Sequence, residues 1–136
     1  HLFGLGGRDE LRGGDGDDRL TGGAGKDLLT GGGGADQFLF DDGDTAATSG
    51  GADTIGDFAQ GDRINVSRID ADDNDGGDQD FTFVGAAAFS GSAGELRSQV
   101  IRGNRYVSGD TDGDAVADFY VRIDGTAPLE AGDFIL

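Results

Sequence analysis

Residues 13–39 read GGDGDDRLT, GGAGKDLLT and GGGGADQFL, which are three consecutive nonapeptides with no gap between them. Residues 4–12, GLGGRDELR, keep the same frame, although Leu5 stands where the second glycine belongs. A fixed period of this kind indicates a repeat fold. Because the sequence begins inside a repeat, we expect more of the array upstream. The sixth position holds Asp9, Asp18, Asp27 and Asp36, and the eighth holds Leu2, Leu11, Leu20, Leu29 and Phe38.

The nonapeptide combines three local preferences. Its glycines permit positive φ and a tight loop whose carbonyls converge. Its aspartate supplies a carboxylate, and its last three residues are extended, with the eighth pointing inward. One nonapeptide therefore gives one turn and one short strand, and two are needed to go around a flattened coil. We expect each repeat to stack on the next but one.

The pattern G-G-x-G-x-D-x-U-x is the calcium-binding repeat of RTX proteins. Loops stacked at roughly 4.8 Å, the spacing of strands, can enclose Ca²⁺ with oxygen ligands at about 2.3–2.6 Å. We expect several ions, one between the loops of Asp9 and Asp27 and another between those of Asp18 and Asp36. Backbone carbonyls are expected to complete the shells; the candidates are Gly13, Asp15, Gly22, Ala24, Gly31 and Gly33. A flexible Gly/Asp linker is the alternative, but it needs no aspartate every nine residues.

The 136-residue chain carries 27 acidic against 10 basic residues, a net charge of -17, which disfavours nucleic acid and anionic membranes as partners. Solubility and adaptation to high salt also explain acidity. Salt adaptation should enrich glutamate too, whereas only Glu10, Glu95 and Glu130 are glutamates. Aspartate among glycines suits turns and hard-cation ligation. There is no cysteine, no apolar run long enough to insert in a membrane and no signal peptide.

The period breaks after Phe40. A polar loop over 41–53 is followed by strand-like runs separated by turn signals. We expect an all-β fold: a parallel β-roll of nonapeptides over 1–40, then a capping antiparallel β-sandwich over 41–136, in one cooperative unit. The expected strands are 54–55, 63–66, 81–84, 95–101, 105–108, 119–123 and 134–136.

Further acidic residues lie outside the repeats. Asp57 and Asp62 are candidates for a metal site at the end of the coil. The run from Asp110 to Asp118 resembles the start of an EF-hand loop. It has Val121 where the bidentate glutamate belongs, so a hairpin turn is favoured. The stretch 69–80 is interpreted as a solvated loop.

No catalytic set stands out. The only histidine is His1, and the sequence contains no His-Glu-x-x-His motif, no Gly-x-Ser-x-Gly elbow and no phosphate loop. We therefore expect a non-catalytic module and no enzyme activity.

Several stretches resemble the C-terminal domain of serralysin-type (peptidase M10) metalloproteases. They are DTIGDFAQGDRINVSRIDA from Asp53, FTFVGAAAFSGSAGELR from Phe81, GDTDGDAVADFYVRIDG from Gly109 and the final DFIL. The resemblance implies a β-roll and β-sandwich that bind several Ca²⁺ and carry an uncleaved C-terminal signal, including residues 133–136. It implies the type I secretion machinery and an upstream domain of the same chain as partners, and an extracellular, bacterial location. That upstream domain is expected to be a metalloprotease or another secreted hydrolase.

The alternative function is a polysaccharide- or surface-binding module that calcium makes rigid. Its binding face would need exposed aromatic side chains. Only Tyr106 and Tyr120 are available besides phenylalanines, and there is no tryptophan, which argues against sugar binding.

Overall fold

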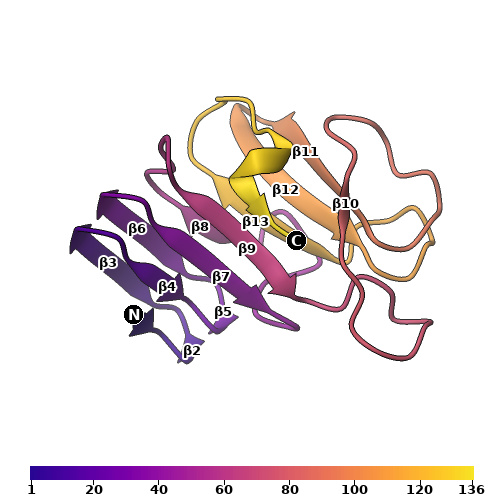
Figure 1. Ribbon diagram of the computed structural model, residues 1–136, viewed down its shortest axis with the longest axis horizontal. Coiled ribbons are helices and arrows are strands. Elements are labelled where there is room, and N and C mark those ends of the chain that lie inside the picture. The colour runs from indigo at the N-terminus through magenta and orange to yellow at the C-terminus, as the bar shows by residue number, and fades with distance from the viewer.

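The computed structural model describes residues 1–136, in which two β-sheets face each other across a shared core (Figure 1). The five-stranded sheet is entirely parallel. Its strands are, in order, β1 (Leu2–Phe3), β4 (Arg19–Thr21), β7 (Gln37–Asp41), β9 (Arg63–Arg68) and β14 (Phe134–Ile135).

The seven-stranded sheet begins in the repeats and ends in the second half of the chain. Its order is β10 (Thr82–Phe83), β11 (Glu95–Ile101), β12 (Asn104–Asp110), β13 (Phe119–Ile123), β8 (Asp53–Ile55), β6 (Leu28–Gly33) and β3 (Glu10–Asp15). A small third sheet pairs β2 (Gly6–Gly7) with β5 (Ala24–Gly25). The one helical element is a 3-10 turn over Ala131–Asp133, so no helix is long and apolar enough to cross a membrane.

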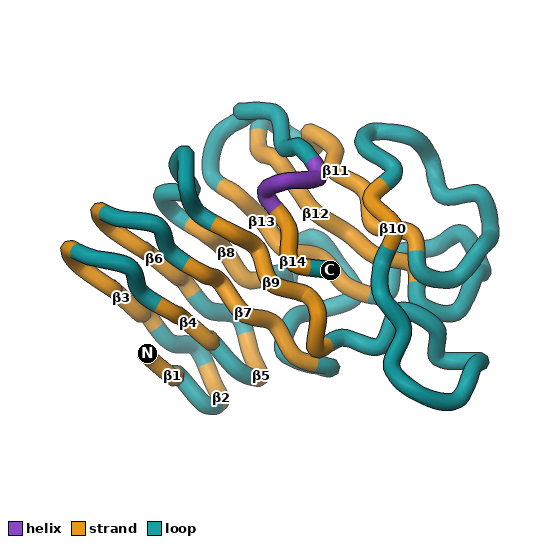
Figure 2. The backbone as a smooth tube through the Cα atoms, in the orientation of Figure 1, coloured by secondary structure: helices purple, strands orange, loops and turns teal.

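Each nonapeptide stacks on the next but one along the chain, as predicted. Leu11 lies beside Leu29 in the seven-stranded sheet, and Leu20 beside Phe38 in the five-stranded sheet. Successive repeats therefore alternate between the sheets, which Figure 2 shows as a coil of short strands joined by loops at both edges. The eighth-position side chains point inward, and Leu20, Leu29 and Phe38 are fully buried. Their burial removes apolar surface from water and is the main force holding the coil together.

The parallel coil continues beyond residue 40, where we expected the cap to begin. After an insertion at 42–52, β8 pairs with β6 and β9 pairs with β7. Ile55 then lies beside Leu29 and Ile64 beside Phe38, so both isoleucines occupy eighth positions. Each of the two large sheets combines strands from before and after residue 40. The division of the chain into domains 1–40 and 41–136 remains a prediction.

The cap is an antiparallel extension of the seven-stranded sheet. Strands β11, β12 and β13 form a meander, and β13 attaches parallel to β8. All the strands expected after residue 53 are present, within a few residues at their ends. A single cluster of 17 buried residues runs from Leu11 in the coil to Phe134 in β14, so coil and cap share one core.

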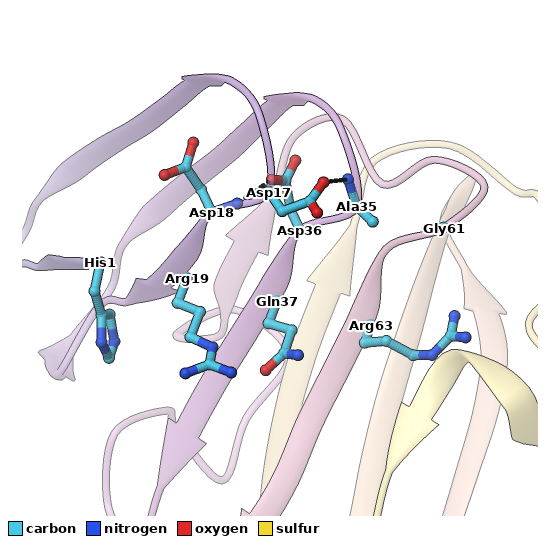
Figure 3. A pocket seen from close by; sticks show the side chains of 9 residues that line it. All are labelled: His1, Asp17, Asp18, Arg19, Ala35, Asp36, Gln37, Gly61 and Arg63. Atoms are coloured by element: carbon cyan, nitrogen blue, oxygen red, sulfur yellow. Dashed lines mark hydrogen bonds between the residues drawn. The ribbon is translucent and has the colours of Figure 1, made fainter.

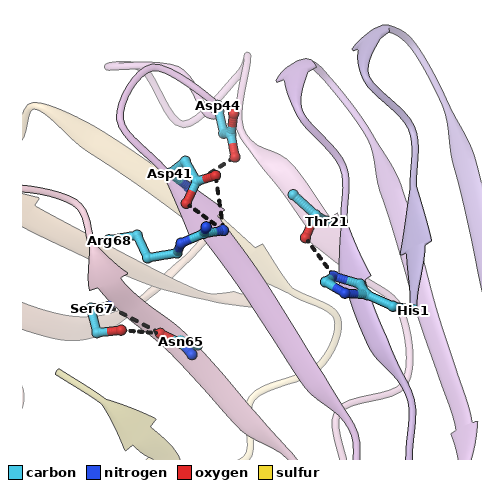
Figure 4. Close-up of polar contacts among 7 residues, drawn as sticks. All are labelled: His1, Thr21, Asp41, Asp44, Asn65, Ser67 and Arg68. Carbon is cyan, nitrogen blue, oxygen red and sulfur yellow. Dashed lines mark hydrogen bonds and ion pairs between the residues drawn. The ribbon is translucent and has the colours of Figure 1, made fainter.

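Side-chain contacts fasten the insertion and the neighbouring strands (Figure 4). The irregular pairing of β7 with β9 brings Asp41 opposite Arg68, and the two form an ion pair at 3.3 Å. Asp44 in the insertion accepts the backbone N–H of Asp41 through Oδ2 at 2.8 Å. The start of the insertion is thereby held against the last turn of the coil.

Stacking also explains the glycine at the second position. Gly14 and Gly32 have nearly equal φ, 102° and 101°, in the region that L side chains rarely adopt. A Cβ on Gly32 would lie 2.0 Å from the carbonyl oxygen of Gly14, whereas a Cβ on Gly14 would meet nothing within 4 Å. Leu5 occupies the same position with φ 81° and an exposed side chain. Position two therefore needs glycine chiefly where another turn packs against it.

Candidate metal centre

The sixth-position aspartates form two rows, one along each edge of the coil. The Asp27 row, made of Asp9, Asp27 and Asp53, leads into the seven-stranded sheet. The Asp36 row, made of Asp18, Asp36 and Asp62, leads into the five-stranded sheet. The first member of each row is less buried than the two that follow it. Asp9 and Asp18 are partly exposed, whereas Asp27, Asp36, Asp53 and Asp62 are at most 2% exposed.

A ladder of hydrogen bonds ties each row together. In the Asp27 row, the backbone N–H of Asp9 donates to Oδ1 of Asp27 at 2.7 Å, and that of Asp27 donates to Oδ1 of Asp53 at 2.8 Å. In the Asp36 row, the same bond joins Asp18 to Asp36 at 2.9 Å and Asp36 to Asp62 at 3.0 Å. One oxygen of each receiving carboxylate therefore fixes the stacking of the turns.

The second oxygens of these carboxylates are the unusual feature. Oδ2 of Asp9, Asp27, Asp53 and Asp36 is buried and has no hydrogen-bond partner. A buried, unpaired carboxylate oxygen costs free energy unless a cation or donor reaches it. Hard cations such as Ca²⁺ take carboxylate and backbone carbonyl oxygens as ligands. The carboxylate and backbone carbonyl oxygens present in both rows are therefore suitable ligands for Ca²⁺.

The first glycine of each repeat makes room for its own carboxylate. A Cβ on Gly22 would lie 2.5 Å from Oδ2 of Asp27, and a Cβ on Gly31 would lie 2.2 Å from Oδ2 of Asp36. A Cβ on Gly13 would also lie 2.5 Å from the carbonyl oxygen of Gly31 in the next turn. The absence of a side chain thus lets the carboxylate fold back over the loop, beside the backbone.

Burial and like charge act together on the inner carboxylates. The pKa of Asp53 is raised to about 7, chiefly by burial and in addition by repulsion from Asp27 and Asp44, against the backbone hydrogen bond from Asp27. Burial likewise raises the pKa of Asp36, with repulsion from Asp62, Asp18 and Asp57. Burial raises the pKa of Asp44 as well, with repulsion from Asp41 and Asp27. These shifts all favour neutralisation, by a proton or by a bound cation.

We expect the calcium-free protein to lose stability as the pH rises from about 4 to about 7. Asp53 keeps its proton in the folded state up to a pKa of about 7, whereas the ordinary value is 3.8. Between these values the folded chain binds a proton that the unfolded chain has released, so the free energy of unfolding falls with pH. Far-UV circular dichroism of the protein in EDTA, from about pH 4 to about pH 8, measures this effect as a loss of β signal, which Asp53→Asn should reduce. A wild-type β signal that grows with pH would contradict the assignment.

The predicted carbonyl ligands lie on facing turns. The stacking sets Gly13 beside Gly31 and Asp15 beside Gly33. The carbonyl of Gly33 already accepts the N–H of Gly16 at 2.6 Å, which leaves it one lone pair. On the other edge, Gly22 approaches Gly4, and Ala24 lies beside Gly6 and donates its N–H to Leu5. The structure thus places the predicted carbonyl ligands on stacked loops, and their binding of an ion stays a prediction.

Asp57 and Asp62 both lie at the end of the coil, as expected. Asp62 closes the Asp36 row, because its Oδ2 accepts the N–H of Ala59 at 2.9 Å and is not left unpaired. Asp57 accepts the N–H groups of Gly31 and Gly32, one on each oxygen, at 2.9 and 2.8 Å. Both carboxylates satisfy backbone donors of the last loops.

Sequence reasoning missed Asp53 and Asp44. Asp53-Thr54-Ile55 and Asp62-Arg63-Ile64 repeat the Asp-x-apolar unit nine residues apart, and this spacing would have placed Asp53 in a row. It was hidden because the insertion at 42–52 shifts the frame. Asp44 gives no local signal, since it reaches the Asp27 row only through the folded insertion, where its carbonyl accepts the N–H of Gly25 at 3.3 Å.

A separate acidic group lies between β12 and β13. Asp110, Asp112 and Asp118 each offer a ligand atom within 4.8 Å of the others, so the group could hold a metal ion. The buried Asp110 accepts the N–H groups of Gly113 and Ala115 at 2.7 and 2.9 Å. The two strands are antiparallel neighbours, which confirms the hairpin turn predicted for this segment.

Comparison with known proteins agrees with this architecture. Residues 12–136 match the family described as Peptidase M10 serralysin C terminal. The solution structure of the AlgE6R2 subunit from the Azotobacter vinelandii mannuronan C5-epimerase is similar, with a TM-score of 0.58 and 25% identity. That similarity covers 99% of this chain and 90% of the subunit.

The AlgE6R3 subunit of the same epimerase shows the same fold, with a TM-score of 0.57, 23% identity and coverage of 97% of this chain and 79% of the subunit. No curated protein sequence matches. The family match covers the repeats from residue 12 and the whole cap, and it confirms the resemblance inferred from the sequence. The chain therefore belongs to the serralysin C-terminal family of peptidase M10 proteins, as a calcium-binding RTX β-roll module.

Proposed function

We propose that this chain is a folding module that becomes ordered when calcium binds outside the cell. The observation that supports it is the set of buried, unpaired Oδ2 atoms in the Asp27 and Asp36 rows. No basic side chain forms an ion pair with any carboxylate of the two rows. The family match and the predominance of aspartate among the acidic residues agree with this function.

Without a cation, the folded state is opposed by two effects. The carboxylates repel one another at the spacing of the loops, and ordering the backbone costs roughly 1–2 kcal/mol per residue. The coil strands are short; β4 and β8 have three residues each. Bound Ca²⁺ would supply positive charge to the unpaired oxygens, and sites of this extracellular class have dissociation constants of about 10⁻⁴–10⁻³ M.

Three positions between stacked loops are proposed to hold ions. Two are those predicted from the repeats, between the loops of Asp9 and Asp27 and between the loops of Asp18 and Asp36. The third lies between the loops of Asp27 and Asp53, where Oδ2 is unpaired on both carboxylates. The Asp36 row offers no equivalent third position, because Asp62 is satisfied by the backbone.

The wider role we propose is export of a larger secreted bacterial protein. The module itself is non-catalytic, carries the C-terminal type I secretion signal and folds after transport, next to an upstream domain such as a serralysin-like metalloprotease. A chain kept unfolded by its own carboxylates, and free of cysteine, is suited to passage through a channel. Deletion of residues 133–136 should abolish secretion of a fused reporter; undiminished secretion would remove this part of the proposal.

The calcium switch is tested by titrating Ca²⁺ into EDTA-treated protein and following far-UV circular dichroism. We expect a cooperative gain of β signal, because coil and cap share one core. Mg²⁺ serves as the control, since it demands a smaller octahedral site and should not replace Ca²⁺. A fully folded protein in EDTA that is indifferent to calcium would show that the coil is a static scaffold.

A further inference from the structure

The outer face of the five-stranded sheet carries a groove that borders the proposed ion position between the loops of Asp18 and Asp36 (Figure 3). Its volume is about 620 Å³ and its lining is polar, with Ala35 the one apolar residue. Arg19, Gln37 and Arg63 form one wall, and the carboxylates of Asp17, Asp18 and Asp36 lie along the edge where the loops turn. We call this feature the Arg19 groove.

The repeat geometry aligns the basic wall. Arg19 is in register with Gln37, and Gln37 with Arg63, on the parallel strands β4, β7 and β9. All three precede a buried eighth-position residue, so their side chains point outward. Strands lie roughly 4.8 Å apart, which separates the two arginines by about 10 Å along the axis of the coil. The column of Arg19, Gln37 and Arg63 therefore has the direction of this axis, which suits a linear ligand.

The two arginines have no acidic partner. Ion pairs elsewhere hold Arg12, Arg68 and Arg122, but neither Arg19 nor Arg63 lies within 4.0 Å of a carboxylate. Arg63 donates one bond, at 3.2 Å, to the carbonyl of Asp62, and Arg19 is exposed. Two unpaired guanidinium groups in one groove are notable in a chain of net charge -17. Their planar, bidentate donors match carboxylate or phosphate groups.

The other polar groups of the Arg19 groove, on Asp17 and Gln37, restrict the class of ligand that it can bind. Asp17 uses Oδ1 to accept the N–H of Ala35 at 2.8 Å, and its exposed carboxylate remains an acceptor for hydroxyl groups. Gln37 offers an amide that both donates and accepts. A chain of acidic sugars carries carboxylates for the arginines and hydroxyls for these groups. Both ligands are polyanions that meet the aspartates, but the hydroxyl groups of an acidic sugar can donate to Asp17, whereas a DNA strand offers its dense row of phosphates and few hydroxyl groups.

We propose that the Arg19 groove binds an acidic, carboxylate-bearing polysaccharide along the axis of the coil. This inference rests on the proposed function, because bound calcium orders this face and lowers the charge of the adjoining loops. The aromatic residues considered for sugar stacking lie elsewhere: Tyr106 is 9% exposed and packs edge-on against Tyr120, with ring centres 6.3 Å apart. Recognition through guanidinium groups does not require them.

The test measures binding of a galacturonate hexamer by isothermal titration calorimetry, at a fixed free Ca²⁺ concentration at which circular dichroism shows the protein folded. A neutral glucose hexamer and a single-stranded DNA oligomer are the comparison ligands. The variant is Arg19→Gln with Arg63→Gln. The matched control is Arg102→Gln, an exposed arginine in the turn between β11 and β12 that has no ion pair.

We expect the galacturonate hexamer to bind and the double variant to weaken it by about tenfold or more, since a hydrogen bond to a charged group contributes about 1.5–3 kcal/mol. Arg102→Gln should leave the affinity unchanged, and both variants should keep the wild-type calcium midpoint. Absence of binding to the folded wild type, equal loss in the control, or equal binding of the glucose hexamer or the DNA would overturn the proposal. If the protein is folded in EDTA and binds there too, the calcium switch fails while the groove assignment stands.

Discussion

Asp27→Asn is expected to raise the calcium concentration at the midpoint of folding by about tenfold or more, because loss of a single carboxylate at a metal site has effects of this size. Asp27 is the middle member of its row and borders two proposed ion positions. Asparagine has nearly the same shape and keeps an oxygen to accept the N–H of Asp9, a bond of 2.7 Å. What it loses is the charge and the unpaired Oδ2. The variant therefore separates ion binding from the stacking of the turns.

Circular dichroism at increasing Ca²⁺ measures this midpoint. Asp75→Asn is the control, since it removes the same charge from an exposed loop at 72–78 that belongs to neither row. Its midpoint should stay within about twofold of wild type, because surface charges have small effects. An equal shift in both variants would mean that net charge, and not the Asp27 row, controls the calcium response.

Gly32→Ala should destabilise the calcium-bound protein by more than about 3 kcal/mol, whereas Gly14→Ala should cost about 1–2 kcal/mol. Both residues occupy the second position of a repeat with φ near 100°, so the strain in the backbone is the same. They differ in what the new methyl group meets. At Gly32 it would lie 2.0 Å from the carbonyl oxygen of Gly14, and at Gly14 it would meet nothing within 4 Å. The backbone carbonyl cannot swing aside as a flexible side chain can.

Urea denaturation at saturating Ca²⁺ gives both free energies of unfolding. The difference between the variants isolates the contact between stacked turns from the preference of glycine for positive φ. Equal losses would indicate that backbone conformation alone demands glycine, and that the turns are packed less closely than described here.

The nine-residue period was enough to predict the stacking of alternate repeats, because every nonapeptide has its loop aspartate at the sixth position and its inward apolar residue at the eighth. Strands of the cap were also predicted, since apolar runs between turn residues are local signals. Asp53 escaped prediction because the insertion at 42–52 displaces the frame by eight residues, although the Asp-x-Ile unit reappears intact. The stacking of alternate repeats already places Arg19 beside Gln37, but the full Arg19 groove was beyond sequence reasoning, since Arg63 becomes a neighbour of Gln37 only once the insertion has folded out of the coil.

The pairing of the C-terminal strands has a consequence for the order in which the molecule forms. Each repeat in the coil contacts a partner only two nonapeptides away, so only a short loop must close when the two strands pair. By contrast, β13 pairs with β8, and β14 with β9, across about half of the chain. Loop-closure entropy makes such distant pairings slow to form. Refolding should therefore be limited by docking of the second half, and the burial of Phe134 should be among its last events.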